Sequence, residues 1–194
     1  SLLPNMIPTM LLQYHLIQLP EPQQVVYKLN GLLDKDIAIY KIYRVPMDKH
    51  ARFSAISRTY KYYIDKTKDP FTYPFAWKAY PLPDIQAMNE ACRVLFDYTD
   101  FTSFSKLHTD VKTNNCIIYE AQWEETDKQL IFTVKANRFL RNMVRAIVGT
   151  LIDVGRGKLT PEDVRKIIES KNRCNAGTSV PAQALFLCHI EYPE

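Results

Sequence analysis

The chain has 194 residues, of which 46% are hydrophobic and 24% charged, which is enough apolar material for a folded core and excludes a disordered or fibrous chain. No apolar run approaches the roughly 20 residues that cross a bilayer, and the opening residues lack the basic start of a signal peptide, so we expect a cytoplasmic protein with no membrane partner. The 4 cysteines are widely spaced and the 4 histidines are isolated, which favours reduced thiols and gives no metal-binding pattern.

The first half of the chain predicts one helix and three strand segments. Apolar residues recur at helical spacing over 22–34, after an acidic residue and a proline that are typical of a helix start. Residues 37–44 are rich in β-branched and aromatic side chains and predict a strand. After a polar break, residues 50–65 predict two short strand segments, of which the second alternates so that one face carries Arg58, Tyr60, Tyr62 and Ile64.

The second half predicts hairpins and helices without a regular βαβ alternation. We first expect an ordered loop over 66–83, a helix after the N-cap Asp84 and a loop over 97–106. A hairpin of strands 116–123 and 129–136 follows. The chain then forms a long helix from Asn137, a helix after Thr160 and a strand over 184–192. This order indicates the α+β class, with an antiparallel or mixed sheet and helices on one face.

The long helix is predicted from the N-cap Asn137 to the glycines at 155 and 157. At 100° per residue, seven apolar side chains fall on one arc, and Arg138, Arg141 and Arg145 share the opposite side. Gly149 lies one turn beyond Arg145 on that side, so the bare backbone there allows another segment to approach closely.

Positive charge is concentrated around this helix. Ten Lys or Arg residues lie between Lys135 and Arg173 against four Asp or Glu residues, a local balance of +6, which exceeds the net charge of +4 of the whole chain. Such a concentration suggests a polyanionic partner such as nucleic acid. An ordinary solvated helix face explains the same charges equally well.

Three stretches together resemble the tRNA pseudouridine synthase A family. They are HARFSAISRTYKYYI at 50–64, NRFLRNMVRAIVGTLIDVGRGK at 137–158 and ALFLCHIEYP at 184–193, with DFTSF at 100–104 as a fourth and weaker match. Their order and spacing fit the family from about Pro22 to the last residue. The resemblance implies the pseudouridine synthase fold, an α+β fold with an antiparallel or mixed sheet and helices on one face.

The resemblance implies an active site built from three side chains. Tyr60 resembles the tyrosine that stacks on the target uracil and is a candidate for taking the proton from C5, although its reference pKa near 10 means that a general-base role needs help. Arg145 resembles the arginine that pairs with the catalytic aspartate, whose loop we expect to approach at Gly149. Leu185 resembles the aliphatic residue below the base, and strand alternation puts it on the side of His189 and Glu191.

The resemblance also implies the partners. The substrate is the anticodon stem-loop of tRNA, the enzyme is a homodimer, and the reaction uses no cofactor and no metal. The expected substrate-binding residues, besides the tyrosine and leucine of the pocket, are Arg52, Arg58, Arg138, Arg141, Arg156 and Lys158.

One departure from the family concerns the nucleophile. The motif Gly-Arg-Thr-Asp followed by Gly-Val-His, which supplies the catalytic aspartate, does not occur in the 194 residues. If His15 is matched without gaps, the aspartate falls at Pro4, and the family's first strands are missing. We therefore expect residues 1–49 to be a remnant of the N-terminal subdomain and residues 50–194 to be the C-terminal subdomain with most of the active-site cleft, without synthase activity in the chain as given.

Two alternatives remain open at this point. The chain could be a non-catalytic RNA-binding module derived from the same fold, which predicts salt-dependent binding of tRNA without isomerisation. It could also be a fragment whose sheet lacks its first strands and which binds little. In that case the sheet exposes an edge and apolar surface.

Overall fold

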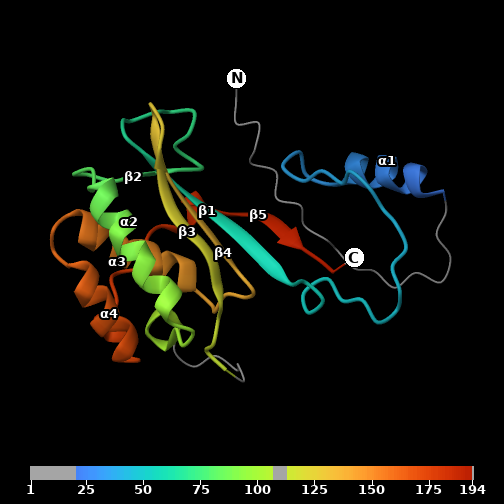
Figure 1. Ribbon diagram of the computed structural model, residues 1–194. Helices are drawn as coiled ribbons and strands as arrows, with labels where there is room; N and C mark the ends of the chain where they lie inside the picture. The colour runs from blue at the N-terminus through green and yellow to red at the C-terminus, as the bar shows by residue number, and fades with distance from the viewer. Residues whose placement is uncertain (1–20, 107–112, 194) are drawn as a thin grey trace. The chain divides into compact units, whose positions relative to one another are not determined.

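The computed structural model describes residues 21–106 and 113–193 (Figure 1). The described residues divide into two compact units, a smaller one that ends at Ser54 and a larger one that begins at Ala55.

The smaller unit contains the helix α1, Pro22–Leu32, as predicted, and none of its residues is buried. The predicted strand over 37–44 is wrong, because this segment pairs with no strand of the described residues. Its backbone is held instead by Asn30, whose side chain accepts a hydrogen bond from Ile39 N at 2.7 Å and donates one to Ile39 O at 2.8 Å. A β-branched sequence forms a strand only where a neighbour satisfies its backbone.

The first of the two strand segments predicted over 50–65 is also wrong. Residues 51–54 form a turn, in which Nδ1 of His50 accepts hydrogen bonds from the backbone N–H groups of Arg52 and Phe53. The backbone N–H of His50 in turn donates to Oγ of Ser54. These local side-chain bonds compete with strand pairing and end the extended chain before the larger unit begins.

The larger unit is built on a mixed sheet of five strands: β1 (Ser57–Asp65), β2 (Trp77–Lys78), β3 (Ile118–Glu125), β4 (Gln129–Ala136) and β5 (Leu185–Glu191). β1 lies in the middle, because it pairs with β4 on one side and with β5 and β2 on the other. Of these three partners, only the short β2 pairs with β1 in parallel. The predicted hairpin is confirmed as β3 and β4, which pair in antiparallel register.

Three helices cover one face of this sheet, as expected: α2 (Ile85–Val94), α3 (Met143–Gly155) and α4 (Pro161–Glu169) (Figure 1). Short 3-10 helices follow α2 at 95–97 and 102–104, and follow α4 at 173–175 and 182–184. Most of α3 is buried, and it packs with Tyr62, Phe132 and other helix-facing side chains of the strands. The fold is α+β, as the sequence predicted.

Two predicted helix starts are confirmed by their caps. The side chain of Asp84 accepts hydrogen bonds from the backbone N–H groups of Gln86 and Ala87 at the start of α2. At the start of α4, Thr160 and Asp163 form a capping box, in which each side chain bonds to the backbone N–H of the other. Local sequence therefore determines where these two helices begin.

The start of α3 differs from the prediction. The helix begins at Met143, and residues 137–142 form a turn in which Asn142 has φ 69°. Asn137 continues the pairing of the hairpin instead, since its backbone N–H donates to Ile117 O and its Oδ1 accepts from Ile117 N. Arg138 and Arg141 therefore lie outside the helix and do not share a helical side with Arg145. The predicted end at Gly155 is confirmed.

Candidate active site

The predicted pocket residues Tyr60 and Leu185 lie on the helix-facing side of the sheet. Tyr62 pairs with Leu185 and Tyr60 with Leu187 across β1 and β5. Because residues paired across antiparallel strands point to the same face, these four side chains share one face. Tyr62 has no exposed surface, and Tyr60 and Leu185 are half-buried against the core.

The expectation that Leu185 shares a side with His189 and Glu191 is wrong. The register shifts between Thr59 and Tyr60, so that β5 contains one extra residue and His189 pairs with Thr59. Glu191 lies on the same opposite face, where it accepts a hydrogen bond from Ser57 at 2.7 Å and pairs with Lys135 at 2.8 Å. A β-bulge reverses the alternation of side chains, which no count along the strand can foresee.

Arg145 reaches this face from the first turn of α3. Its Nε donates to the carbonyl oxygen of Val180 at 2.6 Å, and its charge acts on the phenol of Tyr62. Within the part of the chain that the structure describes, no carboxylate lies within 4.0 Å of its guanidinium. The structure thus brings Arg145, Tyr60 and Leu185 together around Tyr62.

The segment that approaches Gly149 is not an aspartate loop. A Cβ atom on Gly149 would lie 1.9 Å from the carbonyl oxygen of Thr178, and one on Gly177 would lie 2.8 Å from the backbone of Gly149. The expectation of a carboxylate there is therefore wrong, because the chain before β5 already occupies the space. This close packing carries Val180 and Pro181 past Arg145 and Tyr62, whose Oη donates to Pro181 O at 2.9 Å.

The phenol of Tyr60 packs edge-on against the ring of Phe139, with 5.1 Å between ring centroids and 88° between planes. Burial raises the pKa of Tyr60 above its ordinary value, and the charge of Arg58 offsets this only in part. The phenol is consequently protonated near neutral pH. The sequence did not single out Phe139, whose contact with Tyr60 depends on the turn before α3.

Tyr62 is a second residue that the sequence did not single out as functional. Burial raises its pKa and the charge of Arg145 lowers it by less, so that the phenol remains a hydrogen-bond donor to Pro181. Strand alternation with Tyr60 is the sequence pattern that could have identified it. The hydrogen bond from Tyr62 to Pro181 O joins β1 to the segment that leads into Leu185.

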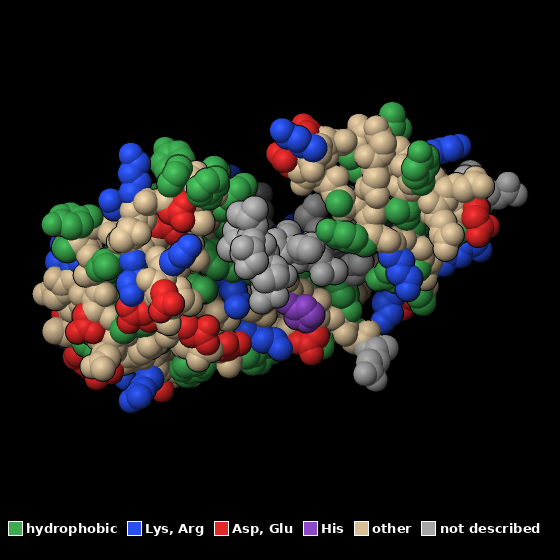
Figure 2. Space-filling model, turned by 90° about the horizontal axis from the view of Figure 1, so that it is seen from above, with side chains coloured by type: hydrophobic (Ala, Val, Ile, Leu, Met, Phe, Trp, Pro, Cys, Tyr) green, Lys and Arg blue, Asp and Glu red, His purple; other side chains and the backbone are tan. Residues whose placement is uncertain are grey.

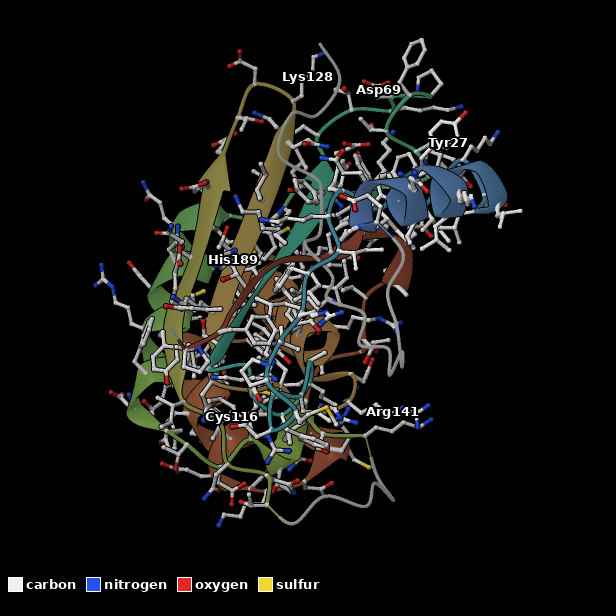
Figure 3. All side chains as sticks on the ribbon, turned by 90° about the vertical axis from the view of Figure 1, so that its right-hand side faces the viewer. Tyr27, Asp69, Cys116, Lys128, Arg141 and His189 are labelled. Carbon is white, nitrogen blue, oxygen red and sulfur yellow. The ribbon has the colours of Figure 1, made fainter. Side chains whose placement is uncertain are left out.

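The predicted RNA-contacting arginines near this site have different surroundings. Nη1 of Arg58 donates to the carbonyl oxygens of Ala55 at 2.9 Å and Asn137 at 2.7 Å. Arg138 is half-buried beside the thiol of Cys116, whose pKa burial raises to about 11 although the arginine charge opposes the rise. Arg141 is exposed, and its side chain projects outward, far from Lys128 (Figure 3).

Two other predicted binding residues are not brought to Tyr60, and a third belongs to the smaller unit. Arg156 and Lys158 lie beyond the far end of α3, which has 13 residues and is therefore roughly 20 Å long. Arg156 donates to Tyr80 O at 3.1 Å, and Lys158 pairs with Asp153 at 3.2 Å. Arg52 belongs to the smaller unit, where its guanidinium lies over the ring of Phe53.

The positive charge that the sequence placed around α3 is partly neutralised. Five of the ten basic residues between 135 and 173 form ion pairs, and Figure 2 shows basic and acidic side chains interspersed over one face of the larger unit. Five arginines in that range have no carboxylate within 4.0 Å among the described residues, and four of them gather at the start of α3: Arg138, Arg141, Arg145 and Arg173. Arg173 is placed there through Ser179, which also accepts a hydrogen bond from Asn142.

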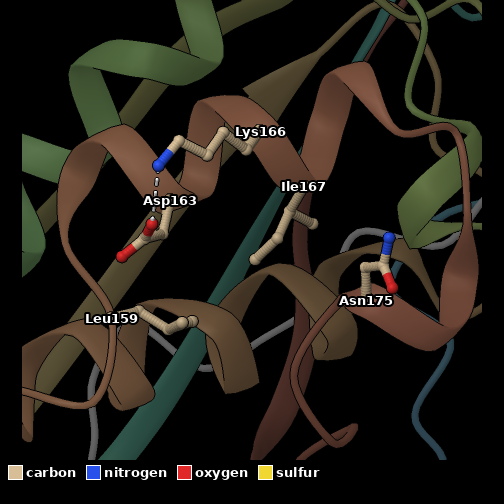
Figure 4. A pocket seen from close by; sticks show the side chains of 5 residues that line it. All are labelled: Leu159, Asp163, Lys166, Ile167 and Asn175. Carbon is tan, nitrogen blue, oxygen red and sulfur yellow. Dashed lines mark hydrogen bonds and ion pairs between the residues drawn. The ribbon is translucent and has the colours of Figure 1, made fainter.

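The described residues form two surface hollows, neither of which is lined by Tyr60, Arg145 or Leu185. One of about 280 Å³ is lined by Leu159, Asp163, Lys166, Ile167 and Asn175 beside α4 (Figure 4). Another, of about 590 Å³, lies on α1 in the smaller unit.

Among the described residues, no group of three His, Cys, Asp or Glu side chains is placed to hold a metal ion. No helix among them is long and apolar enough to cross a membrane.

Comparison with known proteins agrees with the resemblance drawn from the motifs. A family model described as tRNA pseudouridine synthase matches residues 91–193. The chain is 62% identical to tRNA pseudouridine synthase A of Parabacteroides distasonis, over 86% of this chain and 66% of that protein. It is 59% identical to the protein of the same name from Bacteroides fragilis (88% and 68%), and 37% identical to that from Bacillus subtilis (86% and 68%). The chain spans about two thirds of the length of these relatives, and it belongs to the tRNA pseudouridine synthase A family.

Proposed function

We propose that this chain carries the tyrosine and arginine side of the active site of a tRNA pseudouridine synthase, which isomerises uridines in the anticodon stem-loop of tRNA. The observation that carries the proposal is the grouping of Tyr60, Leu185 and Arg145 on one face around Tyr62. The names of the relatives, all tRNA pseudouridine synthase A, support the same reaction.

The reaction exchanges one bond of the uracil for another. The bond between N1 of the base and C1′ of the ribose breaks, C5 bonds to C1′, C5 loses its proton and N1 gains one, so no oxidant, reductant or cofactor is consumed. In the proposed pocket, the target nucleotide is flipped out of its stack, the ring of Tyr60 stacks on the base and Leu185 supports it from below.

The proton step places a condition on Tyr60. A protonated phenol cannot accept the C5 proton, and burial holds the pKa of Tyr60 above its ordinary value. Stacking is therefore the role that the geometry supports best for the state described. Proton transfer to its oxygen requires that the bound substrate or a nearby cation lowers this pKa.

We infer that the 194 residues as given bind tRNA but do not isomerise it. The family's aspartate motif is absent from the sequence, and Arg145 has no carboxylate partner among the described residues. Pro4, the position that alignment assigns to the aspartate, lies outside the described residues. Since carboxylate attack is the first step of the implied mechanism, an unpaired Arg145 alone cannot start the reaction.

The remaining parts of the proposal concern partners and domains. Arg138 and Arg141, which flank Phe139 at the start of α3, contact the phosphate backbone of the stem-loop. The protein acts in the cytoplasm as a homodimer. Residues 1–49 correspond to the remnant of an N-terminal subdomain and residues 50–194 to the C-terminal subdomain that bears most of the cleft.

The experiment measures tRNA binding and turnover on the same preparation. The purified 194-residue chain is mixed with unmodified tRNA that carries tritium at C5 of its uridines, and binding is followed by gel shift at two salt concentrations. We expect salt-dependent binding without tritium release. Release of tritium by this chain overturns its inactivity, and the lack of any binding supports a fragment that binds little.

A second candidate function is favoured by the same unpaired Arg145. A non-catalytic RNA-binding module would retain the four arginines at the start of α3 and need no nucleophile. It predicts the same binding result, so the two functions separate only when an aspartate is supplied from outside the chain.

A further inference from the structure

We propose that Arg58 is a positioning residue of the base pocket, which fixes the turn 137–142 to β1 so that Phe139 holds the ring of Tyr60 in place. This assigns to Arg58 a role other than the RNA contact expected from the sequence. The description of this site as a base pocket rests on the proposed function. The contacts among Arg58, Phe139 and Tyr60 do not depend on that function.

The first step of the argument is the hydrogen bonding of the guanidinium. Arg58 precedes Tyr60 by two residues and shares its face of β1, and one of its nitrogens donates to carbonyl oxygens from two separate segments, those of Ala55 and Asn137. The bond to Asn137, at 2.7 Å, spans 79 positions in the chain. A charged donor forms such bonds more strongly than a neutral one, so it can hold the turn against the strand.

The second step is that the turn is held at both ends. At its start, Asn137 bonds to Ile117 through both its backbone N–H and its side chain. At its end, Asn142 adopts a left-handed conformation and donates to Oγ of Ser179 at 2.6 Å. Phe139 lies between these anchors. Beside the ladder pairing of Arg58 with Ala136, the side chain of Arg58 adds a bond from the tyrosine strand to the turn itself.

The third step is the contact between the two rings. Phe139 meets Tyr60 edge to face, and both side chains are half-buried. This arrangement restricts rotation of the Tyr60 ring and leaves its plane defined before a base arrives. A pocket whose stacking residue is already oriented binds a base with less loss of conformational freedom.

The sharpest test removes the planar guanidinium of Arg58 while keeping its positive charge. Lysine carries the same charge as arginine but not its planar set of donors, so Arg58→Lys should loosen the turn and preserve any electrostatic attraction for RNA. Arg93→Lys, at an exposed position of α2, is the matched control. Phe139→Leu removes the ring and leaves the partners of Arg58 unchanged, and Phe96→Leu is its control.

The first readout is the ring-current shift of Tyr60 in NMR spectra of the 194-residue chain labelled with ¹³C-tyrosine at pH 7. The Tyr60 signals are assigned with Tyr60→Phe. We expect Arg58→Lys to move them in the direction and toward the position seen in Phe139→Leu, while Arg93→Lys leaves them in place. Tyr60 signals that stay in place in Arg58→Lys overturn the proposal.

The second readout is the binding of uridine 5′-monophosphate, followed through the same signals. An aromatic pair contributes about 0.5 to 1.5 kcal/mol, so Arg58→Lys and Phe139→Leu should each weaken binding by about twofold to twelvefold. The double variant should bind no more weakly than Phe139→Leu alone, because both changes act through one ring. Additive losses indicate that Arg58 contacts the nucleotide itself and overturn the proposal.

These readouts separate two failures. If the nucleotide moves no Tyr60 signal in the unaltered chain, the proposed base pocket is wrong, while the ring-current comparison still decides whether Arg58 positions Phe139. If Arg58→Lys does not fold, Phe139→Leu decides alone: nucleotide binding and Tyr60 signals equal to those of the Phe96→Leu control overturn the proposal.

Discussion

Gly149 of α3 and Thr178 of the segment before β5 approach so closely that a Cβ atom on the glycine would lie 1.9 Å from the threonine carbonyl oxygen. A Cβ atom on Gly177 would lie 2.8 Å from the backbone of Gly149, and the N–H of Gly177 donates to Oγ1 of Thr150 at 2.9 Å. Two glycines, one on each segment, therefore allow a helix and a chain segment to pack backbone against backbone. This contact determines where Val180 meets Arg145 and where Leu185 enters the sheet.

The first prediction concerns this contact. Gly149→Ala should lower the free energy of unfolding by about 1 to 3 kcal/mol, because the segment at 177–178 must shift to admit the methyl group. Gly31→Ala on α1, where nothing lies within 4 Å of the added atom, is the control and should be neutral or stabilising. Urea denaturation measures both. A Gly149→Ala chain as stable as the control chain would show that the contact is looser than described.

The second prediction concerns the outer edge of the sheet. Asn89 of α2 donates to Trp123 O at 3.0 Å and accepts from Trp123 N at 2.8 Å, so that its amide completes the backbone bonding of β3. Asn89→Ala should destabilise the chain by about 1 to 3 kcal/mol, since both backbone groups lose their partner. The exposed Gln86→Ala on the same helix should change stability by less than about 0.5 kcal/mol. Thermal unfolding followed by circular dichroism compares them, and equal melting temperatures contradict the prediction.

The third prediction concerns the pH dependence of the α4 cap. Hydrogen bonds from Thr160, the largest of several causes, lower the pKa of Asp163 below its ordinary value. A carboxyl group whose pKa is lower in the folded state stabilises the fold above the pKa of the unfolded chain, about 3.9, and that stability is lost as pH falls through the folded pKa. Asp163→Asn should therefore be less stable than the parent chain at pH 7 and approach it near pH 3. A stability difference that does not shrink on acidification rules out this account of the cap.

The fourth prediction concerns RNA binding by the arginines at the start of α3. Arg141 is exposed next to the turn that carries Phe139. If it contacts a phosphate, Arg141→Gln should weaken tRNA binding for every sequence tested and reduce the slope of log affinity against log salt by about 1. Arg93→Gln, on the exposed side of α2, serves as the control. Identical salt slopes for Arg141→Gln and the unaltered chain would exclude a phosphate contact.

Elements with local sequence determinants were predictable. The caps of α2 and α4 and the alternation of the β3–β4 hairpin each arise from neighbouring residues, and the structure confirms them. The strand over 37–44 was not predictable, since its residues are suitable for a strand but no described strand pairs with them. The start of α3 was missed because Asn137 bonds to Ile117, which lies 20 positions earlier in the chain.

The candidate site shows the same limit. Alternation correctly put Tyr60 and Tyr62 on one face, and Gly149 correctly indicated a close approach. The identity of the approaching segment, the bulge that reverses His189, and the bonding of Arg58 to Asn137 all depend on contacts between distant parts of the chain. The roles of the site residues in catalysis remain predictions.

Our central claim is that Tyr60, Leu185 and Arg145 form one side of the active site of a tRNA pseudouridine synthase. A chimera tests it most directly: the N-terminal part of a family member that carries the Gly-Arg-Thr-Asp motif replaces residues 1–21, and tritium release from C5-labelled tRNA is measured. The account predicts release by the chimera, and a loss of about fivefold to a hundredfold in its Tyr60→Ala variant, which removes the stacking ring. A chimera that folds and binds tRNA but releases no tritium would contradict the claim and identify the chain as a non-catalytic RNA-binding module.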